Sequence, residues 1–458
     1  MSADQQSAAE VSLREAVSGL APDERAAFFR AFLMQVREEH QRGNLSGAEA
    51  AYRSILQIDP ANADALHLLG LLKAQTACVS DAITLLRRAV EQAPAVADFH
   101  VNLGNAFRLA GQFAQAAAAY RSAIAIDGQS AAGHLNLANV LKRQGRLRQA
   151  AKAAGRAAEL APDDPHVRFT LADIYAELDD WDRSIAEYRQ TLYLAPGYFE
   201  AYGQLARLLY RRGEVDQARG LVRDWLRIDP ASPRAVHMLA SLTGENVPAR
   251  ASEAYIRATF DGFAETFDET LGVLEYRAPQ LVVGLLGAVI EAPRGDLDVV
   301  DGGCGTGLCG PLLRPYARRL VGVDLSPPML LRAQARGSYD ELLSADLTAF
   351  LHAARGSWDI IVAADVLVYF GDLSPVLTAA VEALRPGGHL AFTVEHLDDD
   401  LSDGLRLNPH GRYSHTARYV AEAARATGLS LIASEGATLR AEGGNPVAGL
   451  VILARRPD

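Results

Sequence analysis

A spacing of 34 residues runs through the first half of this 458-residue chain. Residues that commonly end helices stand on this spacing at Pro60, Pro94, Gly128, Pro162, Pro196 and Pro230. Small residues recur on the same spacing at Ala48, Ala82, Ala116, Ala150, Ser184 and Ala218. A fixed period of this length indicates stacked helix pairs, because one pair cannot bury its apolar face alone. The first half is therefore predicted to be an all-α solenoid.

Further columns of the repeat point to its family. Leucine precedes a small residue at 69–70, 103–104, 137–138, 171–172 and 205–206, and tyrosine returns at Tyr52, Tyr120 and Tyr188. These columns resemble the tetratricopeptide repeat (TPR), with six units and a capping helix in residues 29–242, after a helical or flexible segment in residues 1–28. The resemblance implies a groove that binds a protein or peptide, and a rigid spacer or self-association surface is the alternative. Candidates to grip a peptide backbone, if they are not simply solvated, are Asn102, Asn105, Asn136 and Asn139.

Residues 243–295 leave the repeat spacing and are predicted to be a linker followed by lid-like helices. Tyr255, Phe260, Phe263, Phe267 and Leu271 lie three to five residues apart, which places them on one face of a helix. Such a face either docks on the neighbouring domain or covers a bound cofactor as a lid that excludes water.

After residue 296, short apolar segments alternate with helical ones. The expected strands are residues 297–301, 320–324, 342–345, 359–363 and 389–395. This alternation predicts a parallel sheet with helices on both faces. Ligands of such sheets bind beyond the carboxyl ends of the strands.

Acidic residues close or follow four of these strands, at Asp301, Asp324, Asp346 and Asp365. After Asp301 comes a turn with Gly303, Gly305 and Gly307, where the backbone can take positive φ and approach a ligand closely. A carboxylate after the second strand is suited to accept hydrogen bonds from ribose hydroxyls. The strand ends are therefore predicted to form a pocket for a nucleoside-containing ligand.

Residues 255–458 resemble the class I S-adenosylmethionine-dependent methyltransferases through four motifs. These are the glycine turn after Asp301, Gly322-Val323-Asp324-Leu325-Ser326, Trp358-Asp359-Ile360-Ile361 and Leu384-Arg385-Pro386-Gly387-Gly388. The resemblance implies an α/β Rossmann-like domain in residues 296–458, with a seven-stranded, mostly parallel sheet. Its final pair, residues 429–435 and 448–454, is expected to include the antiparallel strand. The whole chain looks similar to bacterial tetratricopeptide-repeat methyltransferases.

The same resemblance implies S-adenosyl-L-methionine as cofactor and assigns roles by position. The glycine turn is expected to hold the aminoacyl end, Asp324 the ribose hydroxyls, and Asp346 with the Leu347 amide the adenine. Asp301 is expected to face the ammonium group. The cofactor-binding candidates are Asp301, Gly303, Cys304, Gly305, Gly307, Asp324, Leu325, Asp346, Leu347 and Asp365. Gly302 stands where the family usually has an apolar residue, and it is expected to loosen the strand packing.

Catalytic candidates are sought among residues expected to follow strands at the cofactor edge, where a side chain can align an acceptor or act as a base. They are Asp365, Tyr369, Glu395, His396 and His415. For each histidine, a surface or packing role is the alternative.

NAD is a competing ligand, because Gly305, Gly307 and Gly310 also satisfy the G-x-G-x-x-G pattern with Asp324 downstream. A dinucleotide needs a place for its pyrophosphate at the turn. Asp301, just before the turn, would repel that anion but suits a ligand with an ammonium and a sulfonium. Electrostatics therefore favours S-adenosylmethionine.

Composition restricts the class of function further. The formal net charge of −11 disfavours general nucleic-acid binding. The three cysteines, Cys78, Cys304 and Cys309, show no zinc or redox spacing, so no metal site is expected. Residues 1–10 lack the features of a secretory signal, and no apolar run is long enough for a membrane span. A cytoplasmic location is expected.

The leading hypothesis is a cytoplasmic methyltransferase whose repeats recruit a protein, either as methyl acceptor or as a partner that localises the enzyme. One alternative is a repeat scaffold whose second domain binds S-adenosylmethionine without turnover. The other is a small-molecule methyltransferase that carries its repeats as an adaptor.

Overall fold

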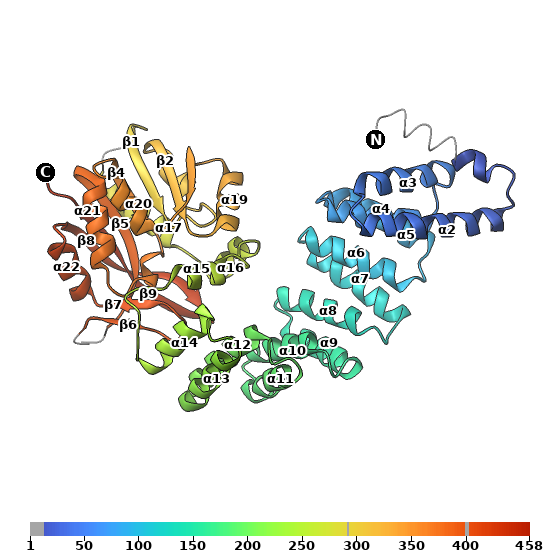
Figure 1. Cartoon of the computed structure of the whole chain (residues 1–458), viewed down its shortest axis with the longest axis horizontal. Helices are drawn as coiled ribbons and strands as arrows, with labels where there is room; N and C mark the ends of the chain where they lie inside the picture. Colours follow the sequence, from blue (N-terminus) through green and yellow to red (C-terminus); the bar gives the residue numbers. More distant parts are fainter. Residues whose placement is uncertain (1–12, 291–292, 399–402) are drawn as a thin grey trace. The chain divides into compact units, whose positions relative to one another are not determined.

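The computed structural model describes residues 13–290, 293–398 and 403–458, so the expectation about residues 1–10 lies outside it. The chain divides into two compact units between Ala201 and Tyr202. Figure 1 shows an all-helical part and a part built around a sheet. Within the described ranges, no helix combines the length and apolarity needed to cross a membrane.

Helix pairs joined by short turns make up the array. Its helices in the first unit are α2 (Pro22–Gln41), α3 (Leu45–Ile58), α4 (Ala63–Gln75), α5 (Val79–Gln92), α6 (Ala97–Leu109), α7 (Phe113–Ile126), α8 (Ala131–Arg143), α9 (Leu147–Leu160), α10 (Pro165–Glu177) and α11 (Trp181–Leu194). Helix α12 (Phe199–Arg211) runs across the division, and α13 (Val215–Ile228) and α14 (Pro233–Thr243) belong to the second unit. Each proline or glycine of the 34-residue spacing stands just after the second helix of a pair. The solenoid predicted from that spacing is confirmed.

Close helix contacts explain the small residues of the repeat. A Cβ added to Gly104 would lie 2.6 Å from Cε1 of Tyr120, so only glycine fits beside that buried ring. The hydroxyl of Tyr120 donates to Oδ1 of Asn105 at 2.7 Å, and Nδ2 of Asn102 lies 2.8 Å from Nε2 of His67. Asn102 and Asn105, candidates for peptide contacts, therefore bind other residues of the array.

A nine-stranded sheet forms the centre of the second unit, counted over the ranges given above. Its strands are β1 (Leu297–Gly302), β2 (Ala317–Asp324), β3 (Glu341–Ser344), β4 (Trp358–Ala363), β5 (Leu384–His396), β6 (Leu405–Leu407), β7 (Tyr413–His415), β8 (Ser430–Glu442) and β9 (Asn445–Arg455). Strands β3-β2-β1-β4-β5 are parallel in that order, and β9 pairs antiparallel with both β5 and β8. These seven strands form the mostly parallel sheet that was predicted.

Strands β6 and β7 form a hairpin that the sequence did not predict. β7 pairs in parallel with the last two residues of β5, and β6 pairs antiparallel with β7. Each has only three residues, too few for an alternating pattern to stand out. The expectation that His396 and His415 follow strands is therefore wrong, because His396 is the last residue of β5 and His415 is the last residue of β7.

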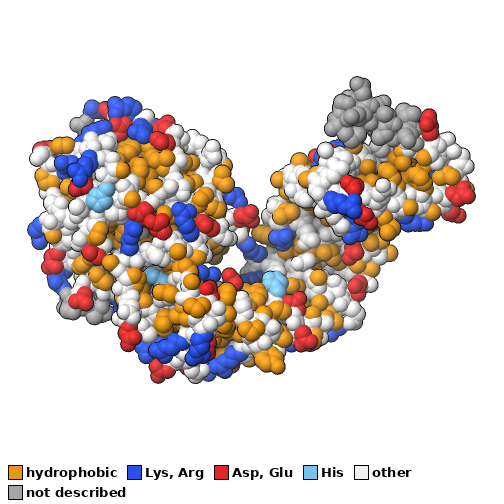
Figure 2. Space-filling model, in the orientation of Figure 1, with side chains coloured by type: hydrophobic (Ala, Val, Ile, Leu, Met, Phe, Trp, Pro, Cys, Tyr) orange, Lys and Arg blue, Asp and Glu red, His pale blue; other side chains and the backbone are white. Residues whose placement is uncertain are grey.

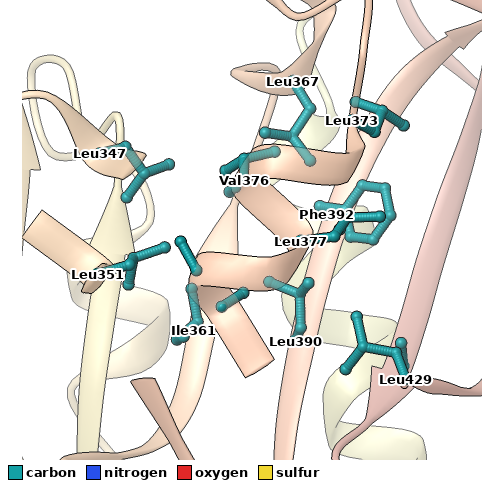
Figure 3. Packing of buried hydrophobic residues seen from close by; sticks show 14 of the residues in the cluster. Leu347, Leu351, Ile361, Leu367, Leu373, Val376, Leu377, Leu390, Phe392 and Leu429 are labelled. Carbon is teal, nitrogen blue, oxygen red and sulfur yellow. The ribbon is translucent and has the colours of Figure 1, made fainter. Parts of the chain in front are cut away.

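Helices cover both faces of the sheet. They are α17 (Ala278–Val289), α18 (Gly310–Leu313), α19 (Pro327–Arg336), α20 (Leu347–Ala353), α21 (Ser374–Ala383) and α22 (Ala417–Ala426). Neighbouring strand residues point to opposite faces. Val300 accordingly packs in the core with α20, α21 and α22, whereas Val299 packs in the core with α17 and α18. Figure 3 shows the first of these cores, where Ile361 and Phe392 of the strands meet Leu351 and Leu377 of the helices.

The surface carries mixed charge. Acidic and basic side chains are interspersed with hydrophobic ones on the face shown in Figure 2.

A cavity at the carboxyl ends of the parallel strands

A cavity of about 240 Å³ lies in the second unit, where β1, β2 and β4 end. Its wall contains the glycine turn after β1 and the residues that follow β2, β3 and β4. Helices α15 (Glu253–Phe260) and α16 (Phe267–Val273) and the end of β8 contribute further side chains. This is the position at which parallel α/β sheets bind their ligands.

The glycine turn is shaped by close contacts on one side and by space on the other. Gly303 has φ of +67°, and a Cβ there would lie 2.3 Å from Cγ2 of Val366. Gly305 also has positive φ, at +52°, but the nearest atom to a Cβ there is 3.8 Å away, on Phe267. The backbone of Gly305 therefore leaves room for a ligand beside it.

Asp301 is a buried carboxyl group at the end of β1. It is 1% exposed, and the hydroxyl of Tyr339 donates to its Oδ2 at 2.5 Å. The pKa of Asp301 is raised to about 7, mainly by burial. The charge of the nearby Asp324 adds to this rise, and the hydrogen bond from Tyr339 opposes it. A cation in the cavity would favour the ionised form of Asp301.

Asp324 ends β2 and is held by two backbone amides. Gly305 donates to its Oδ2 and Ser326 donates to its Oδ1, both at 2.8 Å. Burial raises the pKa of Asp324, and these amides oppose the rise. The carboxylate therefore fixes the glycine turn, and its remaining lone pairs can accept from a ligand hydroxyl.

Asp346 caps helix α20 through its Oδ1, which accepts from the Ala349 amide at 3.0 Å. Its Oδ2 accepts from Nη1 of Arg250 at 2.7 Å. The next residue, Leu347, fills the space beside Gly302, where a Cβ would lie 2.6 Å from Cδ1 of Leu347. The expectation that Gly302 loosens the strand packing is therefore wrong, because the larger leucine occupies the volume that glycine leaves.

Asp365 follows β4 in a left-handed backbone conformation, with φ of +59°. Both of its oxygens accept from Nη1 of Arg440, at 2.9 and 2.8 Å. Arg440 also donates to Glu395 through Nη2 and to Glu442 through Nε. Its side chain is 3% exposed, so this guanidinium is a buried cation surrounded by three carboxylates.

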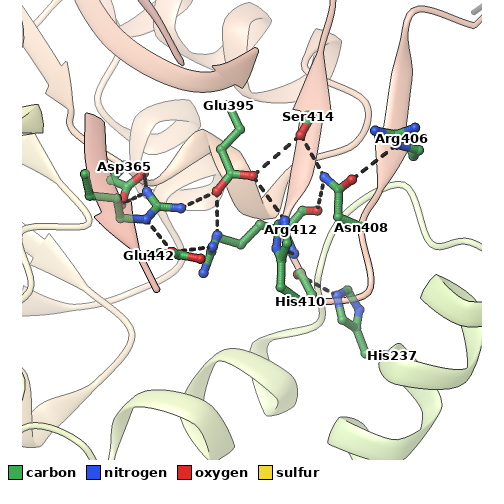
Figure 4. A network of polar contacts seen from close by, with 11 residues as sticks. His237, Asp365, Glu395, Arg406, Asn408, His410, Arg412, Ser414 and Glu442 are labelled. Carbon is green, nitrogen blue, oxygen red and sulfur yellow. Dashed lines mark hydrogen bonds and ion pairs between the residues drawn. The ribbon is translucent and has the colours of Figure 1, made fainter. Parts of the chain in front are cut away.

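Arg412 closes the same network from the β6–β7 hairpin. It donates through Nε to Glu395 and through Nη2 to Glu442, both at 2.6 Å. Glu395 accepts from both guanidiniums, and Arg440 also holds Asp365. Figure 4 shows Asp365, Glu395, Arg412 and Glu442 of this network. The two arginines lower the pKa of Glu442 to about 2 against the effect of burial. Because Asp365, Arg412, Arg440 and Glu442 all line the cavity, one of its ends is strongly ionic.

Aromatic rings of this segment line the cavity, and the helix expected to carry them is broken into α15 and α16 by residues 261–266. A lid role for the segment stays a prediction. Phe260 meets Tyr369 edge to face with ring centroids 5.7 Å apart, and Phe263 meets Phe267 at 5.5 Å. Asp268 of α16 accepts hydrogen bonds from Thr306 in the glycine turn and from Arg336. These polar contacts tie the aromatic segment to the glycine turn.

The structure brings most of the predicted site residues together. The predicted residues that line the cavity are Asp301, Gly303, Cys304, Gly305, Asp324, Leu325, Asp346, Leu347, Asp365 and Tyr369. Gly307 shapes the turn from outside, where a Cβ would lie 2.9 Å from Cε2 of Tyr339. Their roles toward a cofactor stay predictions.

Neither predicted histidine is among the residues that line the cavity. His415 is 0% exposed, its Nε2 lies 2.9 Å from the Gly371 carbonyl oxygen, and burial lowers its pKa to about 4. His396 faces Asp398, with 3.2 Å between Nδ1 and Oδ1. Both side chains are engaged elsewhere in the fold.

Arg412 and Arg440 were not predicted. Arg440 lies in β8 beyond the end of the strand expected at 429–435, and no local signal revealed its acidic partners. Arg412 stands in a turn between two unrecognised strands and gave no signal.

Family models match both parts of the chain. A model described as a methyltransferase domain matches residues 300–392. Models described as TPR repeat or tetratricopeptide repeat match residues 104–145, 135–199 and 175–242. The first match begins in β1 and ends in β5, so it contains the glycine turn and all four predicted acids.

Two curated relatives match part of the chain. Methyltransferase-like protein 27 of Homo sapiens is 42% identical over 84 residues, which are 18% of this chain and 34% of that protein. Malonyl-[acyl-carrier protein] O-methyltransferase of Salmonella typhimurium is 30% identical over 145 residues, which are 32% of this chain and 55% of that protein. The chain thus spans less than two thirds of either relative. Among solved structures, an S-adenosylmethionine dependent methyltransferase from Mesorhizobium loti is 25% identical, with a TM-score of 0.31, over 38% of this chain and 96% of that one.

Proposed function

We propose that this chain, which joins tetratricopeptide repeats to a class I methyltransferase domain, transfers a methyl group from S-adenosylmethionine to an acceptor that its repeats recruit. The observation that carries the proposal is the cavity, where Asp301, Asp324 and the open backbone of Gly305 meet. The repeats support recruitment, because stacked helix pairs present extended binding surfaces.

The residues of the cavity fit the parts of this cofactor. Asp301 offers a buried carboxyl group to its cationic end, and Gly305 leaves space for its aminoacyl chain. Asp324 has lone pairs for two ribose hydroxyls. Leu325 and Leu347 supply apolar contacts for a flat base, and Asp346 can accept from its exocyclic amine beside Arg250.

When bound, S-adenosylmethionine supplies an electrophilic methyl group on a sulfonium, so the protein has mainly to align an acceptor. Asp365 is fixed by two hydrogen bonds from Arg440 and acts as an orienting group. Burial raises the pKa of Tyr369, so its hydroxyl stays protonated and can donate a hydrogen bond to the acceptor. The aromatic rings of α15 and α16 exclude water from the transfer.

NAD fits the same cavity less well. A pyrophosphate on the turn would lie near Asp301 and Asp324, two acidic groups in a buried setting. Repulsion between like charges grows as the dielectric constant falls. A cationic cofactor relieves this repulsion, whereas an anionic one adds to it.

Isothermal titration calorimetry with S-adenosylmethionine and with NAD tests the cofactor. We expect binding of S-adenosylmethionine, weakened roughly tenfold to hundredfold in Asp324→Ala through loss of charge-assisted hydrogen bonds. The control is Asp216→Asn, because the Asp216 side chain is 96% exposed and lies outside the cavity. Binding of NAD without binding of S-adenosylmethionine would overturn the proposal.

A protein, or a group carried on a protein, is the proposed methyl acceptor. The name of the Salmonella typhimurium relative describes an acceptor carried by a protein, which suits a domain joined to repeats. Transfer of label from methyl-tritiated S-adenosylmethionine into the protein fraction of a lysate tests this. Label confined to the small-molecule fraction would favour an adaptor role for the repeats, and label in neither fraction would favour a scaffold that binds the cofactor without turnover.

A further inference from the structure

The ionic end of the cavity is connected to the last helix of the repeat array by a short series of contacts. Helix α14, the β6–β7 hairpin and the cavity all belong to the second compact unit. We propose that His237 on α14 is a positioning residue that holds the β6–β7 turn and thereby places Arg412 at the acceptor end of the cavity. This inference rests on the proposed function, because it assigns the ionic end to the acceptor.

His237 contacts the turn directly. Its side chain is 4% exposed, and its Nε2 lies 2.9 Å from the carbonyl oxygen of Gly411. The imidazole ring packs on Tyr255 of α15 with centroids 4.0 Å apart. Burial lowers the pKa of His237, so the ring is neutral at physiological pH and donates to Gly411 when its proton is on Nε2.

The turn itself fits closely against these two rings. Gly411 has φ of +92°, and a Cβ there would lie 2.2 Å from the Tyr255 hydroxyl oxygen and 3.7 Å from Cδ2 of His237. Within the turn, the Asn408 amide donates to the Arg412 carbonyl at 2.9 Å, and the Gly411 amide donates to the Asn408 carbonyl at 2.8 Å. The peptide that His237 binds therefore leads directly into Arg412.

Arg412 passes this constraint to the cavity. It shares Glu395 with Arg440, and Arg440 holds both oxygens of Asp365. Figure 4 shows this order of contacts, from His237 below the turn to Asp365 at the other end of the network. A displaced turn would leave Glu395 and Glu442 with one guanidinium in place of two.

Other contacts hold the hairpin strands independently of His237. Tyr413 and Leu407 pack with Ala240 of α14, and the Tyr413 hydroxyl donates to the Pro248 carbonyl at 2.6 Å. These contacts keep β6 and β7 in place when the side chain at 237 is changed. A substitution of His237 is therefore expected to loosen the turn while the fold persists.

Two full-length variants separate a positioning role from general packing. His237→Phe keeps an aromatic ring against Tyr255 but removes the donor, whereas His237→Gln supplies an amide donor near the position of Nε2. Val236→Ala is the control on the same helix, because Val236 is 53% exposed. Backbone hydrogen exchange of residues 405–415, measured by mass spectrometry, reports on the turn. Calorimetry with S-adenosylmethionine reports on the cofactor end, and transfer of tritiated methyl groups into lysate protein reports on the acceptor end.

We expect His237→Phe to speed exchange in the turn about threefold to tenfold, the range that loss of one hydrogen bond allows. The same variant should bind S-adenosylmethionine within about twofold of wild type but label lysate protein more slowly. His237→Gln should restore both exchange and labelling. Unchanged exchange in His237→Phe, or equal defects in the Phe and Gln variants, would overturn the inference. Failure of the wild-type protein to bind S-adenosylmethionine would instead reject the proposed function. The hydrogen-exchange measurement does not require the cofactor, so it still tests the role of His237.

Discussion

Binding of S-adenosylmethionine should depend on pH through Asp301. With a pKa of about 7, this carboxyl group is ionised in roughly 9% of molecules at pH 6.0 and in about half at pH 7.0. A ligand cation that requires the carboxylate should then bind about fivefold more tightly at pH 7.0, a gain of about 1 kcal/mol. Binding at pH 6.0 should also release roughly 0.9 proton from Asp301, which calorimetry in buffers of different ionisation enthalpy measures.

The control variant is Asp301→Asn, which removes the titrating group but can still accept from Tyr339. Burial also raises the pKa of Asp324, so the contribution of Asp301 is the difference in pH dependence between wild type and this variant. A second variant, Tyr339→Phe, removes a hydrogen bond that lowers the pKa of Asp301 and should move the titration to higher pH. Equal pH dependence and equal proton release in wild type and Asp301→Asn would refute the reasoning.

The same shift makes a prediction about folding stability. Because the folded pKa of Asp301 is raised above its usual 3.8, the native state binds more protons than the unfolded chain between that pH and about 7. Across this window, the Asp301 contribution to stability falls as pH rises. Asp301→Asn should therefore gain thermal stability relative to wild type at pH 7.0 while losing affinity for the cofactor. A lower melting temperature for the variant at that pH would contradict the claim that the buried carboxyl group of Asp301 destabilises the fold.

Three further changes test other parts of the cavity. Gly303→Ala places a methyl group against Val366 at a residue with a left-handed backbone conformation. We therefore expect a lower melting temperature and loss of S-adenosylmethionine binding. Native-like results in both assays would argue against the described turn. Arg440→Met removes the buried guanidinium that pairs with Asp365 and the buried Glu395, and it should cost about 3–5 kcal/mol in urea unfolding. A loss below about 1 kcal/mol would mean that the network is not formed. Phe260→Ala opens the aromatic cover, and stopped-flow measurement should show faster release of S-adenosylmethionine, whereas an unchanged rate would assign the ring to packing alone.

The features that the sequence predicted well are those that depend on local or periodic signals. The 34-residue spacing of helix-ending residues predicted the helix pairs, because each pair must meet the same packing demand as the next. Parallel topology then brought Asp301, Asp324 and Asp346 to one edge, although none is a sequence neighbour of another. No knowledge of side-chain partners was needed for either inference.

The partners of those acids could not be predicted in the same way. Arg440 binds Asp365 from 75 residues further along the chain, and Arg250 binds Asp346 from 96 residues before it. Such pairs depend on the pairing of β8 with β9 and on the course of the linker, which leave no local pattern around either residue. The compensation of Gly302 by Leu347 is of the same kind, because it requires knowing which side chain of a covering helix packs against the glycine.

Helix α14 both ends the repeat array and packs on the β6–β7 hairpin, and the repeat spacing alone does not reveal the second contact. By sequence period, α14 is the capping helix of an array that was expected to stop at residue 242. In the structure, the division between the two compact units falls within α12, and α14 packs on the hairpin that carries Arg412. Removing residues 1–242 would therefore delete His237 and expose the buried side chains of Leu407 and Tyr413. A loss of activity could then come from damage to the hairpin, so it would not show whether the array recruits the acceptor. A truncation that keeps every residue from Tyr202 onward preserves these contacts, and it isolates the effect of the repeats that precede them.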